Sequence, residues 1–187
     1  MKIFIIHGSY GNPDENWFPW LKKELESRGN SVFVPEFPTP KNQNLDNWMN
    51  KFNVYLNEID ENTVFIGHSL GPAFILSVLE KLTLSKPVKA CFFVSGFLGL
   101  LGNQEFDEIN KTFTTKDFDW KKIKSSCQKF HVFQSDNDPY VPIERAKELA
   151  EGLDAEITVV SGAGHFNEAA GYTKFDLLLE KINKEIS

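Results

Sequence analysis

One short segment constrains the fold of this chain more than any other. Residues 62–78 read NTVFIGHSLGPAFILSV, an apolar strand-like run, a turn with a glycine two residues before and after Ser69, and a helix-like stretch. A side chain at either flanking position would collide with the neighbouring strand and helix, so only glycine fits there. The pattern predicts a nucleophile elbow, in which the turn lifts the Ser69 hydroxyl clear of the sheet and aims the first helix amides at the same point.

Strand-like and helix-like segments alternate along the rest of the chain. We expect strands at residues 3–6, 31–34, 63–66, 88–95, 129–135 and 156–160, and helices at 16–28, 45–59, after the elbow, at 143–151 and at 173–186, with 96–125 less regular. The strands are apolar throughout, as expected for strands buried on both faces, which predicts an α/β fold with a mostly parallel sheet and helices on both faces. A chain of 187 residues suits one domain, residues 1–187.

Charge and composition exclude several classes of partner. The net charge is −6 and no basic cluster occurs, which argues against nucleic acid or an anionic membrane as a partner. No apolar run is long enough to span a bilayer, and the N-terminal run is too short for a signal peptide, so we expect a cytoplasmic protein. Cys91 and Cys127 lack metal-ligand spacing and are expected to be free thiols.

A serine hydroxyl needs a base to accept its proton and a third group to orient that base. Of the four histidines, we choose His165 as the base, because its glycine-rich loop can place the ring over the elbow. His68 adjoins Ser69 on a tight turn and is expected to point away from the hydroxyl. His131 begins an apolar strand and is expected to pack there, whereas His7 ends the first strand and could border the site.

Two aspartates compete for the third position. Both follow the strand at 129–135, at the carboxyl edge of the sheet where sites collect. Asp136 comes directly after the strand, where a short side chain often caps the turn, so we prefer Asp138 and keep Asp136 as the alternative. For the oxyanion hole we expect the backbone N–H of Leu70 and a second amide from Ser9 or Tyr10.

These motifs resemble those of the small α/β-hydrolases of the retinoblastoma-binding-protein-9 type, which include bacterial proteins of the YdeN kind. The matching segments run nearly end to end: His7-Gly8, residues 35–40 with Trp48, residues 67–71, residues 136–142 and residues 162–167. The resemblance implies a three-layer sandwich with about six parallel strands in the order 2-1-3-4-5-6, and no large lid. It also implies a catalytic triad of Ser69, Asp138 and His165.

The residues after the fourth expected strand bear on the substrate. Too few residues separate this strand from the next for a cap domain. We expect a shallow acyl pocket walled by Phe97, Leu98 and Leu101, with contributions from His7, Leu100 and Phe106. The alternative is that these side chains pack a short helix onto the sheet.

The sequence therefore predicts a serine hydrolase that uses no metal and no cofactor. HExxH, GxGxxG and GxxxxGK[ST] are all absent. We expect a small-molecule acyl substrate, which is an ester, thioester or amide. Carboxylesterase-like activity is the broader expectation, and aminopeptidase-like amide hydrolysis is the more specific one. The alternative is a hydrolase-fold protein that acts mainly as a binding or regulatory module. No protein partner is identified.

Overall fold

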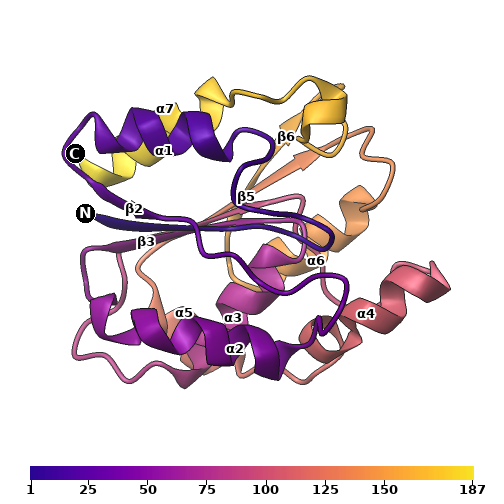
Figure 1. The fold of residues 1–187 in the computed structure, drawn as a ribbon, viewed down its shortest axis with the longest axis horizontal. Helices are drawn as coiled ribbons and strands as arrows, with labels where there is room; N and C mark the ends of the chain where they lie inside the picture. The colour runs from indigo at the N-terminus through magenta and orange to yellow at the C-terminus, as the bar shows by residue number, and fades with distance from the viewer.

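Six parallel strands lie between two layers of helices in the computed structural model, which describes residues 1–187 (Figure 1). The strand order β2-β1-β3-β4-β5-β6 is the predicted one. The strands are β1 (Lys2–Ile6), β2 (Ser31–Phe33), β3 (Thr63–His68), β4 (Ala90–Val94), β5 (Phe130–Ser135) and β6 (Glu156–Val160). All neighbouring strands run parallel, so their carboxyl ends meet at one edge of the sheet.

Helices cover both faces of the sheet, as Figure 1 shows. One face carries α1 (Phe18–Glu26) and α7 (Asp176–Ile186). The other carries α2 (Leu45–Phe52), α3 (Gly71–Lys81), α4 (Gln104–Thr114), α5 (Trp120–Ser126) and α6 (Ile143–Gly152). Two short 3-10 helices, η1 (Asn53–Glu58) and η2 (Glu168–Ala170), complete the fold. The sheet thus separates two hydrophobic cores, of 30 residues on the α3 face and 19 on the α1 face.

The strands differ in burial according to their place in the sheet. Every residue of β3, β4 and β5 is buried, because helices cover both of their faces. The edge strands β2 and β6 are partly exposed, and β6 has no fully buried residue. The expectation that all strands are buried on both faces was therefore wrong for these two, since an edge strand lacks a neighbour on one side.

The segment expected to be less regular, residues 96–125, contains two helices. Asn103 caps α4 by accepting the Phe106 N–H, and Asp119 caps α5 by accepting the Lys122 N–H. The helix expected at 45–59 is α-helical only to Phe52 and continues as η1. Side-chain caps, rather than apolar periodicity, define where α4 and α5 begin.

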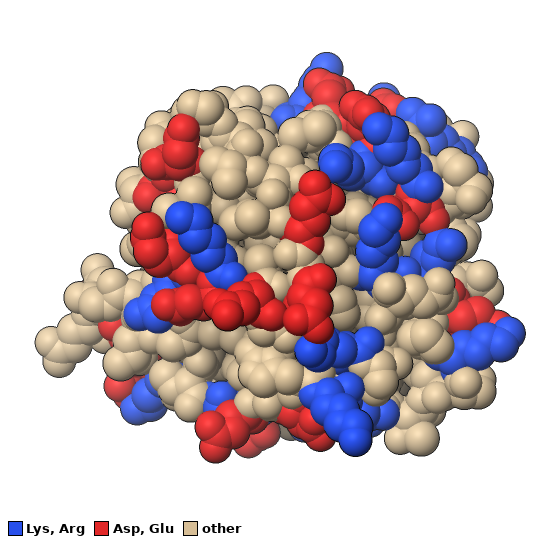
Figure 2. All heavy atoms as spheres, turned by 180° about the vertical axis from the view of Figure 1, so that it is seen from behind, with Lys and Arg blue, Asp and Glu red and all other residues tan.

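The molecular surface carries charges of both signs. On the face seen in Figure 2, Lys and Arg side chains are interspersed with Asp and Glu, and no extended basic patch forms there. None of the helices is long and apolar enough to cross a membrane.

Candidate active site

The Ser69 turn between β3 and α3 is held in a conformation that requires its flanking glycines. Ser69 has a φ of 58°, in the left-handed region. A Cβ on Gly67 would lie 2.6 Å from the main-chain nitrogen of Pro72, and one on Gly71 would lie 2.4 Å from the carbonyl oxygen of Ile6. Both distances are shorter than any real carbon contact, so neither position can carry a side chain without a shift of the backbone. The strained serine and its two glycines form the elbow that the sequence predicted.

The loop after β1 approaches the elbow closely. A Cβ on Gly8 would lie 2.7 Å from the Cβ and 3.2 Å from the Oγ of Ser69. The Ser69 amide donates to the carbonyl oxygen of Val94, at 2.9 Å, which ties the turn to the end of β4. Ser69 is only 5% exposed. The hydroxyl therefore sits at the bottom of a depression instead of projecting into bulk water.

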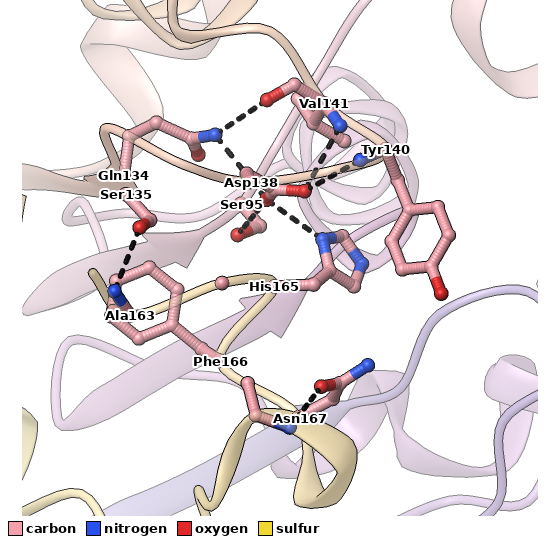
Figure 3. A network of polar contacts seen from close by, with 12 residues as sticks. Ser95, Gln134, Ser135, Asp138, Tyr140, Val141, Ala163, His165, Phe166 and Asn167 are labelled. Atoms are coloured by element: carbon pink, nitrogen blue, oxygen red, sulfur yellow. Dashed lines mark hydrogen bonds and ion pairs between the residues drawn. The ribbon is translucent and has the colours of Figure 1, made fainter.

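Asp138 and His165 are hydrogen-bonded to each other. Oδ2 of Asp138 lies 2.8 Å from Nδ1 of His165, and the two side chains are 1% and 9% exposed (Figure 3). The second carboxylate oxygen accepts the backbone N–H groups of Tyr140 at 2.9 Å and Val141 at 3.1 Å. The imidazole and the two amides thus fix both the position and the orientation of the carboxylate.

Two further donors reach the same carboxylate from neighbouring strands. The Ser95 hydroxyl donates to Oδ2 at 2.8 Å, and the Gln134 amide lies 3.3 Å from it. Burial alone would raise the pKa of Asp138, but the hydrogen bond and charge of His165 and the two backbone amides outweigh it and lower the pKa below the usual range. Asp138 is therefore an ionised acceptor, which leaves Nδ1 of His165 as the protonated nitrogen.

The loops of Asp138 and His165 are joined by consecutive side-chain contacts. Side chains at 135–137 accept the backbone amides of residues 162–164. Asp136 Oδ1 accepts Gly162 N–H at 2.8 Å, Ser135 Oγ accepts Ala163 N–H at 3.0 Å, and Asn137 Oδ1 accepts Gly164 N–H at 2.8 Å. Asp136, the alternative to Asp138, thus binds the backbone of the histidine loop and not the imidazole.

His68 supports the histidine loop from below. Its Nε2 lies 2.8 Å from the carbonyl oxygen of His165, to which it donates. Burial first, and the nearby His165 second, lower the pKa of His68 from 6.5 to about 3, so its ring is neutral. The Trp17 indole N–H donates in the same way to the carbonyl of Phe166, at 3.0 Å. Two ring N–H groups from outside the loop therefore hold the backbone carbonyls of two consecutive residues of that loop.

Two backbone amides near Ser69, those of Ser9 and Leu70, have no acceptor within the protein, whereas the neighbouring amide of Tyr10 has one. The amide of Tyr10 donates to the Thr39 hydroxyl at 2.7 Å. The amides of Ser9 and Leu70 donate to no protein group. Of the two alternatives for the second oxyanion donor, Ser9 is therefore the one with a free N–H.

No hydrogen bond joins Ser69 Oγ to His165 Nε2 in this structure, although both residues border the same cavity.

That cavity has a volume of about 580 Å³. Besides Ser69 and His165, it is lined by the Ser9-Tyr10 loop, by Glu15, Asn16, Asn103 and Asn167, and by the apolar side chains of Leu101, Phe106, Pro139 and Tyr140. Leu101 and Phe106, two of the expected pocket residues, face it. This size suits a small-molecule substrate.

The other expected pocket residues lie elsewhere. Phe97 is 1% exposed within the core, and Leu98 packs against that core. His7 is fully buried: its Nδ1 donates to the Gly8 carbonyl at 2.8 Å, and its Nε2 accepts the Phe37 N–H at 3.1 Å. His7 therefore anchors the loop at residues 35–40 and does not line the cavity.

Several residues around the site carried no motif in the sequence. Ser95 and Gln134, which contact Asp138, sit at or near the ends of apolar strands. A polar residue closing an otherwise apolar strand, on the edge where Ser69 and Asp138 lie, was the only available signal. Gln43 and Asn110, which contact Ser9, gave none.

An open parallel sheet with a strained serine elbow after β3, and with an aspartate–histidine pair on the loops after β5 and β6, defines an α/β hydrolase. The family model described as serine hydrolase matches residues 3–184. The chain belongs to this serine hydrolase family, as its resemblance in sequence suggested.

Individual relatives cover nearly the whole chain. YdeN of Bacillus subtilis (strain 168) is 36% identical over 189 residues, covering 98% of this chain and 97% of the relative. Serine hydrolase RBBP9 of Rattus norvegicus is 27% identical, covering 100% and 96%. The crystal structure of the ydeN gene product from B. subtilis superposes with a TM-score of 0.92 at 33% identity, covering 98% and 97%.

More distant structures share the fold alone. An extracellular alpha/beta-hydrolase from a Paenibacillus species has a TM-score of 0.68 at 16% identity, covering 99% of this chain and 98% of its own.

Proposed function

We propose that this hydrolase cleaves an ester, thioester or amide of a small substrate through a triad of Ser69, His165 and Asp138. The observation that carries the proposal is the 2.8 Å contact between Asp138 and His165, beside the cavity that Ser69 borders. Activity resembling that of a carboxylesterase is the form we favour, because small activated esters can enter a cavity that is open to solvent and has no large lid. Amide hydrolysis of the aminopeptidase kind uses the same groups.

The chemistry follows from the protonation states. With Nδ1 protonated and bound to Asp138, Nε2 of His165 is free to accept the Ser69 proton as Oγ attacks the substrate carbonyl carbon. The resulting imidazolium then protonates the leaving group as the acyl-enzyme forms. Water, deprotonated by the same Nε2, attacks the acyl carbon, and the proton returns to Ser69 as the acid leaves. Asp138 stabilises the imidazolium in both halves.

The negative charge of the tetrahedral intermediate needs donors that are already in place. The free amides of Leu70 and Ser9 are the groups we assign to it, since the Tyr10 amide is already bound to Thr39. Both donors belong to backbone next to the sheet: Leu70 directly precedes α3, and Ser9 lies on the loop after β1.

Labelling with a fluorophosphonate probe tests this proposal. Wild type should label rapidly, and folded Ser69→Ala and His165→Ala variants should not. His131→Ala serves as the matched histidine control, because His131 stacks on Phe92, away from the cavity. Labelling that persists in Ser69→Ala would exclude Ser69 as the nucleophile.

A second candidate function rests on the missing hydrogen bond between Ser69 and His165. If that contact does not form with substrate, the fold serves as a binding module with little turnover. The pH profile of ester cleavage separates the two. A working histidine base gives a rate of ester cleavage that falls at acid pH. A binding module gives a flat trace of activity.

A further inference from the structure

We call the loop after β1, residues 8–10, the oxyanion loop. A polar cluster made of the buried Gln43 and Asn110 side chains and the partly buried Ser9 side chain holds this loop. Ser9 Oγ donates to Asn110 Oδ1 at 2.6 Å and accepts from Gln43 Nε2 at 2.9 Å. Gln43 Nε2 also donates to Asn110 Oδ1, at 2.7 Å, which closes the triangle. Asn110 is 1% exposed and Gln43 is 8% exposed. The Ser9 side chain is thus fixed by groups from two distant segments.

The same glutamine also controls the next residue of the loop. Gln43 Oε1 accepts the Thr39 hydroxyl proton, and Thr39 Oγ1 accepts the Tyr10 N–H at 2.7 Å. Tyr10 has a φ of 59°, a conformation that a side chain rarely adopts. These contacts hold the loop in a strained turn, in which the Tyr10 amide is occupied and the Ser9 amide is left free.

The stability of the folded state does not by itself explain this cluster. Nδ2 of Asn110 is buried without any partner, and an unsatisfied buried donor destabilises the folded state. An apolar side chain on α4 would pack against the surrounding core without that penalty. A buried polar group kept at such a cost indicates a role beyond packing.

We propose that Asn110 and Gln43 are positioning residues, which fix the Ser9 amide where it meets the oxyanion of the intermediate. The inference rests on the proposed function, since it assigns support to that site. It also links α4, which contributes Phe106 to the cavity wall, to the oxyanion loop through Asn110.

Ester hydrolysis by Ser9→Ala, Asn110→Ala and the double variant tests the proposal, with p-nitrophenyl acetate as the substrate. Each single change should lower kcat about 10- to 100-fold, less than the removal of an oxyanion donor, and should leave KM within about twofold. Both changes break the hydrogen bond between Ser9 and Asn110. The kcat of the double variant should therefore be about equal to that of the more impaired single variant. Asn50→Ala, at an exposed asparagine on α2, should match wild type.

A second measurement separates positioning from a structural role. The inhibition constant of phenylboronic acid, which forms a tetrahedral adduct with serine, should rise in parallel with the loss of kcat/KM. A structural role would lower the melting temperature without that parallel. If Asn110→Ala does not fold, Ser9→Ala and Gln43→Ala decide the matter, because neither alters α4.

Different results would contradict the positioning role and the proposed hydrolase function. Ester hydrolysis that survives in Ser69→Ala would overturn the proposed function itself. Hydrolysis that is lost in Ser69→Ala but keeps the wild-type kcat in folded Ser9→Ala and Gln43→Ala would overturn the positioning role alone. Losses that multiply in the double variant would also overturn it.

Discussion

Oδ2 of Asp138 and Nδ1 of His165 lie 2.8 Å apart, and the Ser95 hydroxyl and the amides of Tyr140 and Val141 also donate to this carboxylate. This contact is one of several between the two loops, because the side chains at 135–138 all hydrogen-bond to residues 162–165. The geometry of the imidazole is therefore determined by the whole length of contact between the two loops and not by one ion pair.

Replacing Asp138 by asparagine should lower kcat for p-nitrophenyl acetate about 10³- to 10⁴-fold, because an amide favours the wrong imidazole tautomer. Asp136→Asn is the matched control. It keeps an oxygen that can accept the Gly162 amide, so its rate should stay within about tenfold of wild type. Equal losses in the two variants would contradict the assignment of Asp138.

Gly8→Ala should abolish rapid labelling by a fluorophosphonate, because its Cβ would lie 2.7 Å from that of Ser69. We expect a loss of at least about 100-fold in the labelling rate, since small displacements of reacting groups cost this much. Gly29→Ala is the control: its φ of 82° makes the change unfavourable, by about 1 kcal/mol, yet its Cβ would meet no atom within 4 Å. It should lose stability and keep the wild-type labelling rate.

The fold could be predicted from the sequence because its strongest signals are local. The apolar run 63–66 and the glycines around Ser69 specify the strand, the turn and the helix within a few residues. The helices α4 and α5 gave a weaker signal. Asn110 interrupts the buried stripe of α4 with a polar side chain, and α5 has only seven residues, of which Ile123 and Ser126 are buried.

The site could be predicted only as far as motifs and chain order reach. Asp138 and His165 lie on loops whose residue types indicate a turn, and the parallel sheet brings those loops to one edge. Ser95 and Asn110 act through contacts between segments far apart in the chain, and nothing local marks such residues. The placement of His7 and Leu98 also depended on side-chain direction, which an apolar run leaves open.

The unfolding free energy should fall as the pH is lowered below 6.5, in part because of His68. Its pKa is about 3 in the folded chain and 6.5 for an unperturbed histidine, so between these values the unfolded chain binds the extra proton. Stability therefore rises with pH in this window, with a slope of up to about 1.4 kcal/mol per pH unit from this residue. The total between pH 4.5 and 6.5 is about 2 kcal/mol, because the unfolded histidine is only half protonated at the upper end. Burial lowers the pKa of His7 and His131 as well, which adds slope of the same sign.

Urea unfolding at several pH values between 4.5 and 7 measures this contribution. His68→Gln keeps an amide donor for the His165 carbonyl and removes the titrating group. It should be less stable than wild type at pH 7 and should show a shallower dependence on pH. If the two variants showed the same dependence of stability on pH, the pKa of His68 would be the same in the folded and unfolded chains, and the prediction would be wrong.

The acyl specificity should respond to Leu101 and not to Leu98. Leu101 lines the cavity, so Leu101→Trp should fill space that a longer acyl chain needs. We expect kcat/KM for p-nitrophenyl hexanoate to fall at least about tenfold relative to the acetate, as one or two methylenes in a pocket are worth this much. Leu98 packs against the same core but does not line the cavity, so Leu98→Trp should lower the melting temperature and leave the hexanoate-to-acetate ratio unchanged. A ratio that changes in Leu98→Trp but not in Leu101→Trp would place the acyl chain against Leu98 instead of Leu101 and would contradict this assignment.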